Sequence, residues 1–142
     1  MKESNEKIRI LFICTHNSAR SQIAEGLVNK FLNKKYMAFS GGTEPSMVNP
    51  FAVKAMAEIG IDISKHASKG LDEFLSQDFD YVITVCDNAN ENCPYFPGGK
   101  VRMHKSFKDP ATVEGDDTVK LEAFRQARDE IKEWLEEKFG SS

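Results

Sequence analysis

The fold is decided by residues 10–26, ILFICTHNSARSQIAEG, in which an apolar run passes through a polar loop into a helix-forming segment. The apolar run begins at residue 7, and residues 7–13 are short and rich in β-branched side chains, which predicts a buried strand. In residues 21–33, Ile23, Leu27 and Phe31 recur at helical spacing. The stretch therefore predicts a strand–loop–helix unit with Cys14 where the strand ends.

The rest of the chain continues the alternation of strands and helices. Further strands are predicted at residues 36–40, 81–86 and 100–104, and further helices at residues 50–59, 71–75 and 119–139. This order predicts an α/β fold, a four-stranded parallel sheet with helices on both faces. No linker or repeat divides the chain, so residues 1–142 are expected to form a single domain. Such sheets bind ligands at the carboxyl ends of strands, where Cys14 and Cys86 both fall.

The composition argues against several classes of function. A net charge of −3 is opposite to the basic excess of nucleic-acid and membrane-surface binders, so neither partner is expected. The first residues, MKESNEK, contain no apolar leader, and no apolar run approaches the roughly 20 residues of a membrane span. Three cysteines in such a chain indicate a reducing compartment, and we expect a cytoplasmic protein. The absence of a large exposed apolar stripe in the sequence pattern favours a monomer.

The loop that runs from Cys14 to Arg20 has the composition of an oxyanion site. Its backbone N–H groups converge ahead of a helix N-terminus, and Arg20 adds a guanidinium that binds two oxygens at once. The same positive field favours the thiolate of Cys14, to which Ser21 is placed to donate a hydrogen bond. The pattern predicts a nucleophile facing a tetrahedral oxyanion, and a packing cysteine beside a surface arginine is the alternative. The residues expected to bind the oxyanion are Thr15, His16, Asn17, Ser18, Ala19 and Arg20.

Residues 14–26, CTHNSARSQIAEG, resemble the active-site loop of the low-molecular-weight tyrosine phosphatase fold. They are more similar to the loop of the arsenate reductases built on that fold. The phosphatases tend to carry proline after the Arg-Ser pair, whereas this chain has Gln22 and continues as the reductases do. The resemblance implies that Cys14 attacks arsenate while Arg20 and the loop hold it.

Cys86 and Cys93 enclose six residues, DNANEN, which are rich in Asp, Asn and Glu. That spacing is too long for a zinc knuckle, and no second pair follows it, so no metal site is expected there. The segment CDNANENCPYFPG, residues 86–98, is similar to the redox segment of thioredoxin-coupled arsenate reductases. The resemblance implies that Cys86 and Cys93 receive the oxidation of Cys14. It also implies a thioredoxin-like partner as reductant and no bound organic cofactor.

Asp109 and Pro110 follow the predicted fourth strand. As a dipeptide they indicate only a turn, but in the family an Asp-Pro pair at this place implies a general acid, which protonates the departing oxygen. Phosphatases usually continue with aromatic residues that grip phosphotyrosine. Here Ala111 and Thr112 follow, which argues against that substrate.

Some members of the family bind potassium near the loop. Asn17, Glu25 and Ser40 match its side-chain ligands, whereas Lys69 stands where the family has aspartate. We hypothesise that the Lys69 ammonium takes the place of the cation.

Two other functions stay open at this point. A phosphatase for a small phosphomonoester would use Cys14, Arg20 and Asp109 and would have no use for Cys86 and Cys93. A non-catalytic sensor of arsenite or a soft metal would use the three sulfurs. Such a sensor has no need of Asp109, and the sequence contains no recognisable DNA-binding element.

Overall fold

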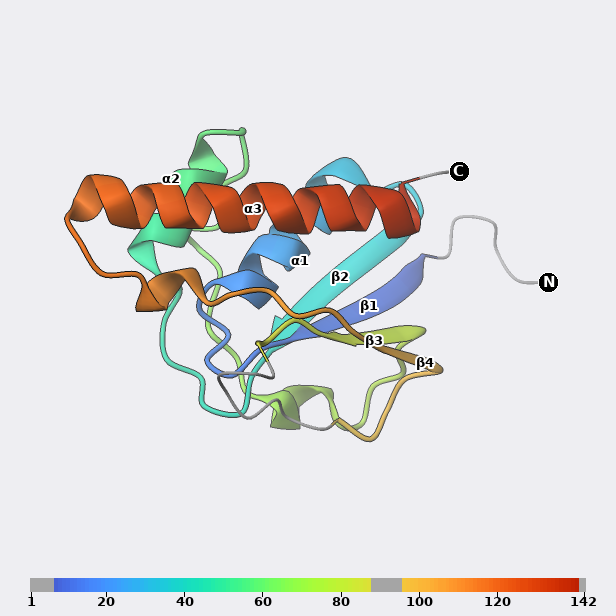
Figure 1. The fold of residues 1–142 in the computed structure, drawn as a ribbon. Helices are drawn as coiled ribbons and strands as arrows, with labels where there is room; N and C mark the ends of the chain where they lie inside the picture. Colours follow the sequence, from blue (N-terminus) through green and yellow to red (C-terminus); the bar gives the residue numbers. More distant parts are fainter. Residues whose placement is uncertain (1–6, 88–95, 141–142) are drawn as a thin grey trace.

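The computed structural model describes residues 7–87 and 96–140 (Figure 1). The elements follow one another in the order β1 (Ile8–Ile13), α1 (Arg20–Phe31), β2 (Tyr36–Gly41), α2 (Pro50–Ala57), the 3-10 helix η1 (Leu71–Phe74), β3 (Tyr81–Thr84), β4 (Val101–His104), the 3-10 helix η2 (Pro110–Thr112) and α3 (Asp117–Phe139). No helix in these ranges is both long enough and apolar enough to cross a membrane.

The sheet has four strands in the order β2-β1-β3-β4, and every neighbouring pair is parallel. Ile13 at the end of β1 pairs with Gly41 of β2 and with Thr84 of β3, and Thr84 pairs with His104 of β4. The carboxyl ends of all four strands therefore meet at one edge. The prediction of a four-stranded parallel sheet in an α/β domain is confirmed.

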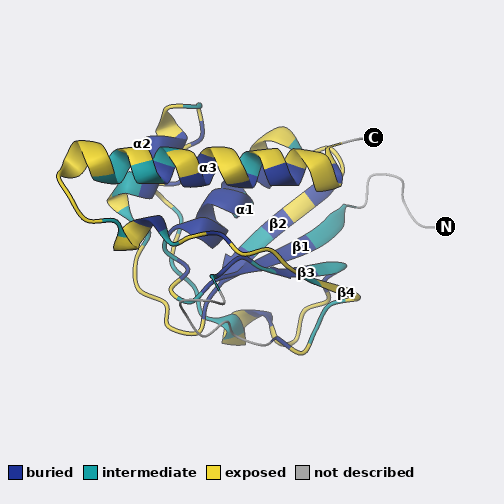
Figure 2. Ribbon diagram, viewed as in Figure 1, coloured by how far each residue is buried: buried dark blue, intermediate teal, exposed yellow. Residues whose placement is uncertain are grey.

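The two faces of the sheet are covered differently. Helices α1, α2 and α3 lie together on one face, and the outer side of α3 is exposed while its inner side is buried (Figures 1 and 2). Ile10 and Phe12 of β1 belong to the core on that side. Leu11 and Ile13 belong to a smaller core on the other side, together with Phe74 of η1. The predicted helix on the second face is thus a single 3-10 turn.

Three elements, α1, α2 and β3, end two residues earlier than their sequence pattern predicts, and α1 ends at Phe31. β3 ends at Thr84 and not at Cys86, because its neighbours β1 and β4 end at Ile13 and His104. α2 ends at Ala57 and not at Ile59, because its last bonds tighten to i→i−3 and Gly60 then adopts a positive φ of 82°. The predicted start of α2 is confirmed, since the Asn49 side chain accepts a hydrogen bond from the Phe51 N–H.

Candidate active site

Cys14 follows β1 at the carboxyl edge of the sheet and is almost fully buried, with 2% of its surface exposed. Its N–H donates to the Gly41 carbonyl at 3.2 Å, so the loop begins against the end of β2. A Cβ on Gly42 would lie 2.5 Å from the carbonyl oxygens of both Cys14 and Thr15. The loop backbone therefore passes β2 at a distance that only glycine permits.

The nucleophile candidate and Ser21 are in direct contact. Cys14 Sγ lies 2.8 Å from Ser21 Oγ, and Asn17 Nδ2 donates to the same Oγ at 2.9 Å. While Cys14 is a thiol either atom of this contact can donate, but a thiolate can only accept, so Ser21 then donates to the sulfur. Asn17 has a φ of 51°, the one positive value for a residue other than glycine in the described ranges. The loop thus places beside Cys14 a hydroxyl that donates to the thiolate form of the sulfur.

Arg20 joins the loop of residues 14–20, called the oxyanion loop below, to the loop that carries Asp109, called the acid loop. Its side chain is buried, Nη1 donates to the Phe107 carbonyl at 3.1 Å, and Nη2 lies 3.6 Å from Asp109 Oδ2. Asp109 also caps η2, since its Oδ1 accepts from the Ala111 N–H at 2.9 Å. The Asp109 side chain keeps 24% of its surface exposed. The fold therefore brings the predicted acid beside the predicted oxyanion-binding arginine.

Cys86 lies two residues beyond β3 and is fully buried. β3 is the neighbour of β1 in the sheet, so the chain segments that carry Cys86 and Cys14 leave the same edge side by side. Cys14 is a free thiol, whereas Cys86 is disulfide-bonded. Cys93 falls outside the described residues.

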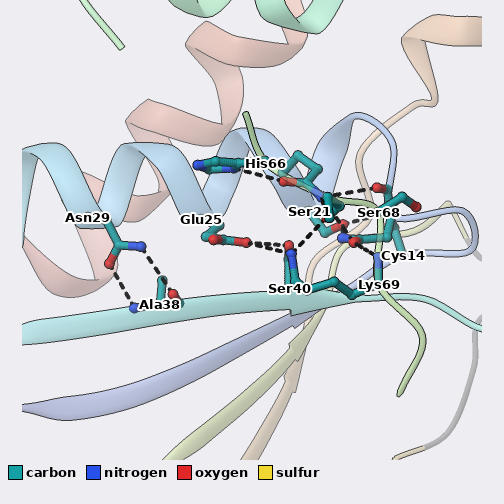
Figure 3. A network of polar contacts seen from close by, with 12 residues as sticks. Cys14, Ser21, Glu25, Asn29, Ala38, Ser40, His66, Ser68 and Lys69 are labelled. Carbon is teal, nitrogen blue, oxygen red and sulfur yellow. Dashed lines mark hydrogen bonds and ion pairs between the residues drawn. The ribbon is translucent and has the colours of Figure 1, made fainter. Parts of the chain in front are cut away.

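The residues that match the family's potassium ligands gather next to the loop (Figure 3). The Ser40 hydroxyl donates to Glu25 Oε1, and Lys69 Nζ lies 3.8 Å from the same oxygen. The Lys69 ammonium also donates to the Ala67 carbonyl at 2.9 Å, while the Lys69 backbone N–H donates to Asn17 Oδ1 at 2.6 Å. Within residues 7–87 and 96–140, no three His, Cys, Asp or Glu side chains are grouped as a metal site.

The remaining loop residues are held mainly through their backbone. The carbonyls of Thr15, His16 and Ser18 accept hydrogen bonds from the N–H groups of Glu44, Ser46 and Asn49, respectively. The His16 side chain is exposed, and its Nδ1 lies 3.1 Å from the Glu44 carbonyl. Ala19 is buried at the start of α1. The segment after β2 therefore braces the loop along its length.

Sequence reasoning did not find two contributors to the site. The Phe107 carbonyl accepts a hydrogen bond from Arg20 Nη1, and no sequence pattern indicates a backbone acceptor of this kind. Gln22 is fully buried and donates to both oxygens of Asn17. The sequence feature that pointed to Gln22 was a polar residue in the first turn of the predicted helix, at a position where the phosphatases tend to carry proline.

Comparison with known proteins agrees with this geometry. The sequence model of the family described as "Low molecular weight phosphotyrosine protein phosphatase" matches residues 9–140. An arsenate reductase of Halalkalibacterium halodurans is 50% identical over 127 residues, which cover 89% of this chain and 91% of the relative. An arsenate reductase of Bacillus subtilis is 42% identical over 128 residues, covering 90% and 92% of the two chains.

Solved structures give the same result. The crystal structure of an arsenate reductase from Archaeoglobus fulgidus superposes with a TM-score of 0.76 at 31% identity, covering 93% of this chain and 99% of the other. A thioredoxin-dependent arsenate reductase of Corynebacterium glutamicum superposes with a TM-score of 0.64 at 27% identity, covering 95% of this chain and 63% of the other. With its Cys14–Arg20 loop, acid loop and parallel sheet, the chain belongs to the low-molecular-weight phosphotyrosine protein phosphatase family, in which its relatives include arsenate reductases.

Proposed function

We propose that the protein reduces arsenate to arsenite by a relay of three cysteines that a thioredoxin-like protein regenerates. The observation that carries the proposal is the buried Cys14 thiol, which faces the Ser21 hydroxyl in a loop closed by Arg20 and Asp109. The identity of 50% to an arsenate reductase over most of both chains supports arsenate as the substrate. The two further cysteines supply a route for electrons that phosphate transfer does not need.

The first step forms a bond between sulfur and arsenic. Arsenate binds as a dianion to the loop N–H groups and the Arg20 guanidinium, and the Cys14 thiolate attacks arsenic. Asp109 gives its proton to the departing oxygen, which leaves as water. The Ser21 hydroxyl, 2.8 Å from the sulfur, stabilises the thiolate before the attack.

The second step transfers two electrons. The Cys86 thiolate attacks the Cys14 sulfur, the pair of the sulfur–arsenic bond passes to arsenic, and arsenite leaves. The resulting Cys14–Cys86 disulfide is attacked by Cys93, which frees Cys14 and gives a Cys86–Cys93 disulfide. A thioredoxin dithiol then reduces that disulfide and is itself oxidised. The free Cys14 and the disulfide-bonded Cys86 in the structure match the end of this relay.

Two features follow from the relay. The sulfurs carry the electrons, so the reaction needs no bound organic cofactor. A thioredoxin partner acts in a reducing compartment, and we place the protein in the cytoplasm on that ground.

We also propose that the Lys69 ammonium replaces the potassium ion of related enzymes. The position of Nζ, 3.8 Å from Glu25 and 2.9 Å from the Ala67 carbonyl, supports this role. A fixed ammonium among oxygen acceptors supplies the positive charge that a bound monovalent cation would supply.

The test is arsenate-dependent oxidation of NADPH in the presence of thioredoxin and thioredoxin reductase. We expect turnover by the wild type and none by Cys86→Ser. Cys93→Ser is expected to release one arsenite per protein and then to stall as the Cys14–Cys86 disulfide, which mass spectrometry detects. Steady turnover by Cys93→Ser with thioredoxin alone would contradict the relay.

A phosphatase is the second candidate, because the family model and the shared residues Cys14, Arg20 and Asp109 fit that chemistry as well. Wild-type protein that hydrolyses a small phosphomonoester but shows no arsenate-dependent NADPH oxidation would establish the phosphatase. A non-catalytic arsenite sensor would show neither activity. A sensor has no need of an aspartate at the oxyanion-binding arginine, so the contact between Arg20 and Asp109 argues against this function.

A further inference from the structure

Gln22 has a set of contacts that the proposed mechanism does not use. It lies in the first turn of α1 with its side chain fully buried. Its Nε2 has three acceptors within reach: the Asn17 carbonyl at 3.2 Å, Asn17 Oδ1 at 3.0 Å and the Ala67 carbonyl at 2.9 Å. Its Oε1 lies 3.0 Å from His66 Nδ1. A buried amide with partners on both atoms is fixed in position.

The chemistry of these partners also fixes which way the amide points. The carbonyls of Asn17 and Ala67 can only accept hydrogen bonds, so the NH2 group of Gln22 must face them. Its oxygen then faces His66, whose Nδ1 carries the hydrogen. Gln22 therefore joins the oxyanion loop to the segment 66–69. Ala67, one of its acceptors, lies 45 residues further along the chain.

The same reasoning orients Asn17. The Lys69 backbone N–H can only donate, and it lies 2.6 Å from Asn17 Oδ1. The same oxygen also accepts a hydrogen bond from Gln22 Nε2. The Asn17 amide must then turn its NH2 to Ser21 Oγ, at 2.9 Å. Ser21 lies beside Cys14 Sγ and donates to it once Cys14 is a thiolate, because a thiolate can only accept (Figure 3). In the thiolate form, one chain of hydrogen bonds with a single direction therefore ends at the sulfur.

We propose that Gln22 is a positioning residue for Cys14. Its NH2 group holds both oxygens of Asn17, and so keeps that residue in the left-handed conformation, φ 51°, from which Nδ2 reaches Ser21. Without Gln22, the Asn17 oxygens keep only the Lys69 N–H on Oδ1, so Asn17 can relax toward an ordinary φ and its Nδ2 then moves away from the Ser21 hydroxyl. The inference rests on the proposed function only in that Cys14 is the nucleophile.

The test uses the reactivity of Cys14 and no arsenate, so its outcome is independent of the proposed reductase activity. In a chain with Cys86→Ser and Cys93→Ser, Cys14 is the single thiol, since the sequence has three cysteines. The rate of its alkylation by iodoacetamide is measured between about pH 5 and 9, because only the thiolate reacts. Gln22→Met keeps the length of the side chain and removes its hydrogen bonds.

The matched control is Asn29→Leu. Asn29 is another side-chain amide on α1, and it ties the helix to β2 through two hydrogen bonds with the Ala38 backbone, at 2.9 and 3.1 Å (Figure 3). We expect Gln22→Met to slow alkylation at neutral pH about tenfold and to move the profile to higher pH, as loss of one hydrogen bond to a charged group does. Asn29→Leu is expected to leave both unchanged.

Two results would overturn the proposal. One is a Gln22→Met profile that coincides with that of the parent chain. The other is slower alkylation in both variants in proportion to their loss of melting temperature, which would make Gln22 merely structural. If Gln22→Met does not fold, Gln22→Glu keeps the shape and sets an oxygen against the carbonyls of Asn17 and Ala67. It is expected to slow alkylation as well, and a parental rate would again overturn the proposal.

Discussion

Substitution of Gly42 by alanine is expected to displace the oxyanion loop. The new Cβ would lie 2.5 Å from the carbonyl oxygens of Cys14 and Thr15, whereas ordinary contacts begin at 3.4 Å. Both obstacles are backbone atoms, so no side chain can move aside. The loop must therefore shift by about 1 Å, and a shift of that size in an active site costs about 100-fold in rate.

The control for this prediction is Gly70→Ala. Gly70 pairs with Gly42 in an isolated parallel bridge, but a Cβ there would meet nothing nearer than Pro45 Cγ at 3.8 Å. Its φ of −83° suits any residue. We therefore expect Gly70→Ala to keep the parental rate.

Single-turnover arsenate reduction and Cys14 alkylation measure the effect. Both rates should fall in Gly42→Ala, and circular dichroism should show an intact sheet and helices. A parental single-turnover rate in Gly42→Ala would refute the reasoning. Equal losses of rate in Gly42→Ala and Gly70→Ala would refute the reasoning as well. They would show that the pairing of Gly42 with Gly70 tolerates no side chain, whether or not that side chain approaches Cys14.

Three further predictions concern the acid, the cation and the stability of the fold. Asp109→Asn should slow the first arsenite released by about 100-fold or more, with Cys14 alkylation unchanged, since the general acid acts only on the departing oxygen. Replacing sodium by potassium should leave the turnover rate unchanged if the Lys69 ammonium stands in for the ion; a several-fold rise would contradict that role. Hydrogen bonds from Arg125 and Arg128 lower the pKa of Glu58 to about 2 in the folded protein. This carboxylate therefore stabilises the fold above its unfolded pKa of about 4.5, and the stabilisation fades as the pH falls toward 2. Urea titrations should show Glu58→Gln less stable than the parent at neutral pH and equal to it at low pH; a difference independent of pH would contradict this account.

The sequence was sufficient for the features that depend on neighbouring residues. The order of strands and helices, the N-cap at Asn49 and the unit around Cys14 could all be predicted, because periodicity and capping are local signals. The end of β3 could not be, since Val85 and Cys86 are as apolar as the strand itself. The strand ends where β1 and β4 end, and only the assembled sheet decides that.

The site divides in the same way. The sequence by itself supplied the candidate residues: a cysteine and an arginine in one loop, an aspartate in another, and two more cysteines with six residues between them. Only the tertiary structure decided how they meet. It sets Arg20 between the Phe107 carbonyl and Asp109, and it holds the Asn17 amide, oriented by the backbone N–H of Lys69, against the Ser21 hydroxyl beside the sulfur. Such contacts join residues that are far apart in the chain, so they arise from packing and from the fixed polarity of backbone groups, which no local pattern records.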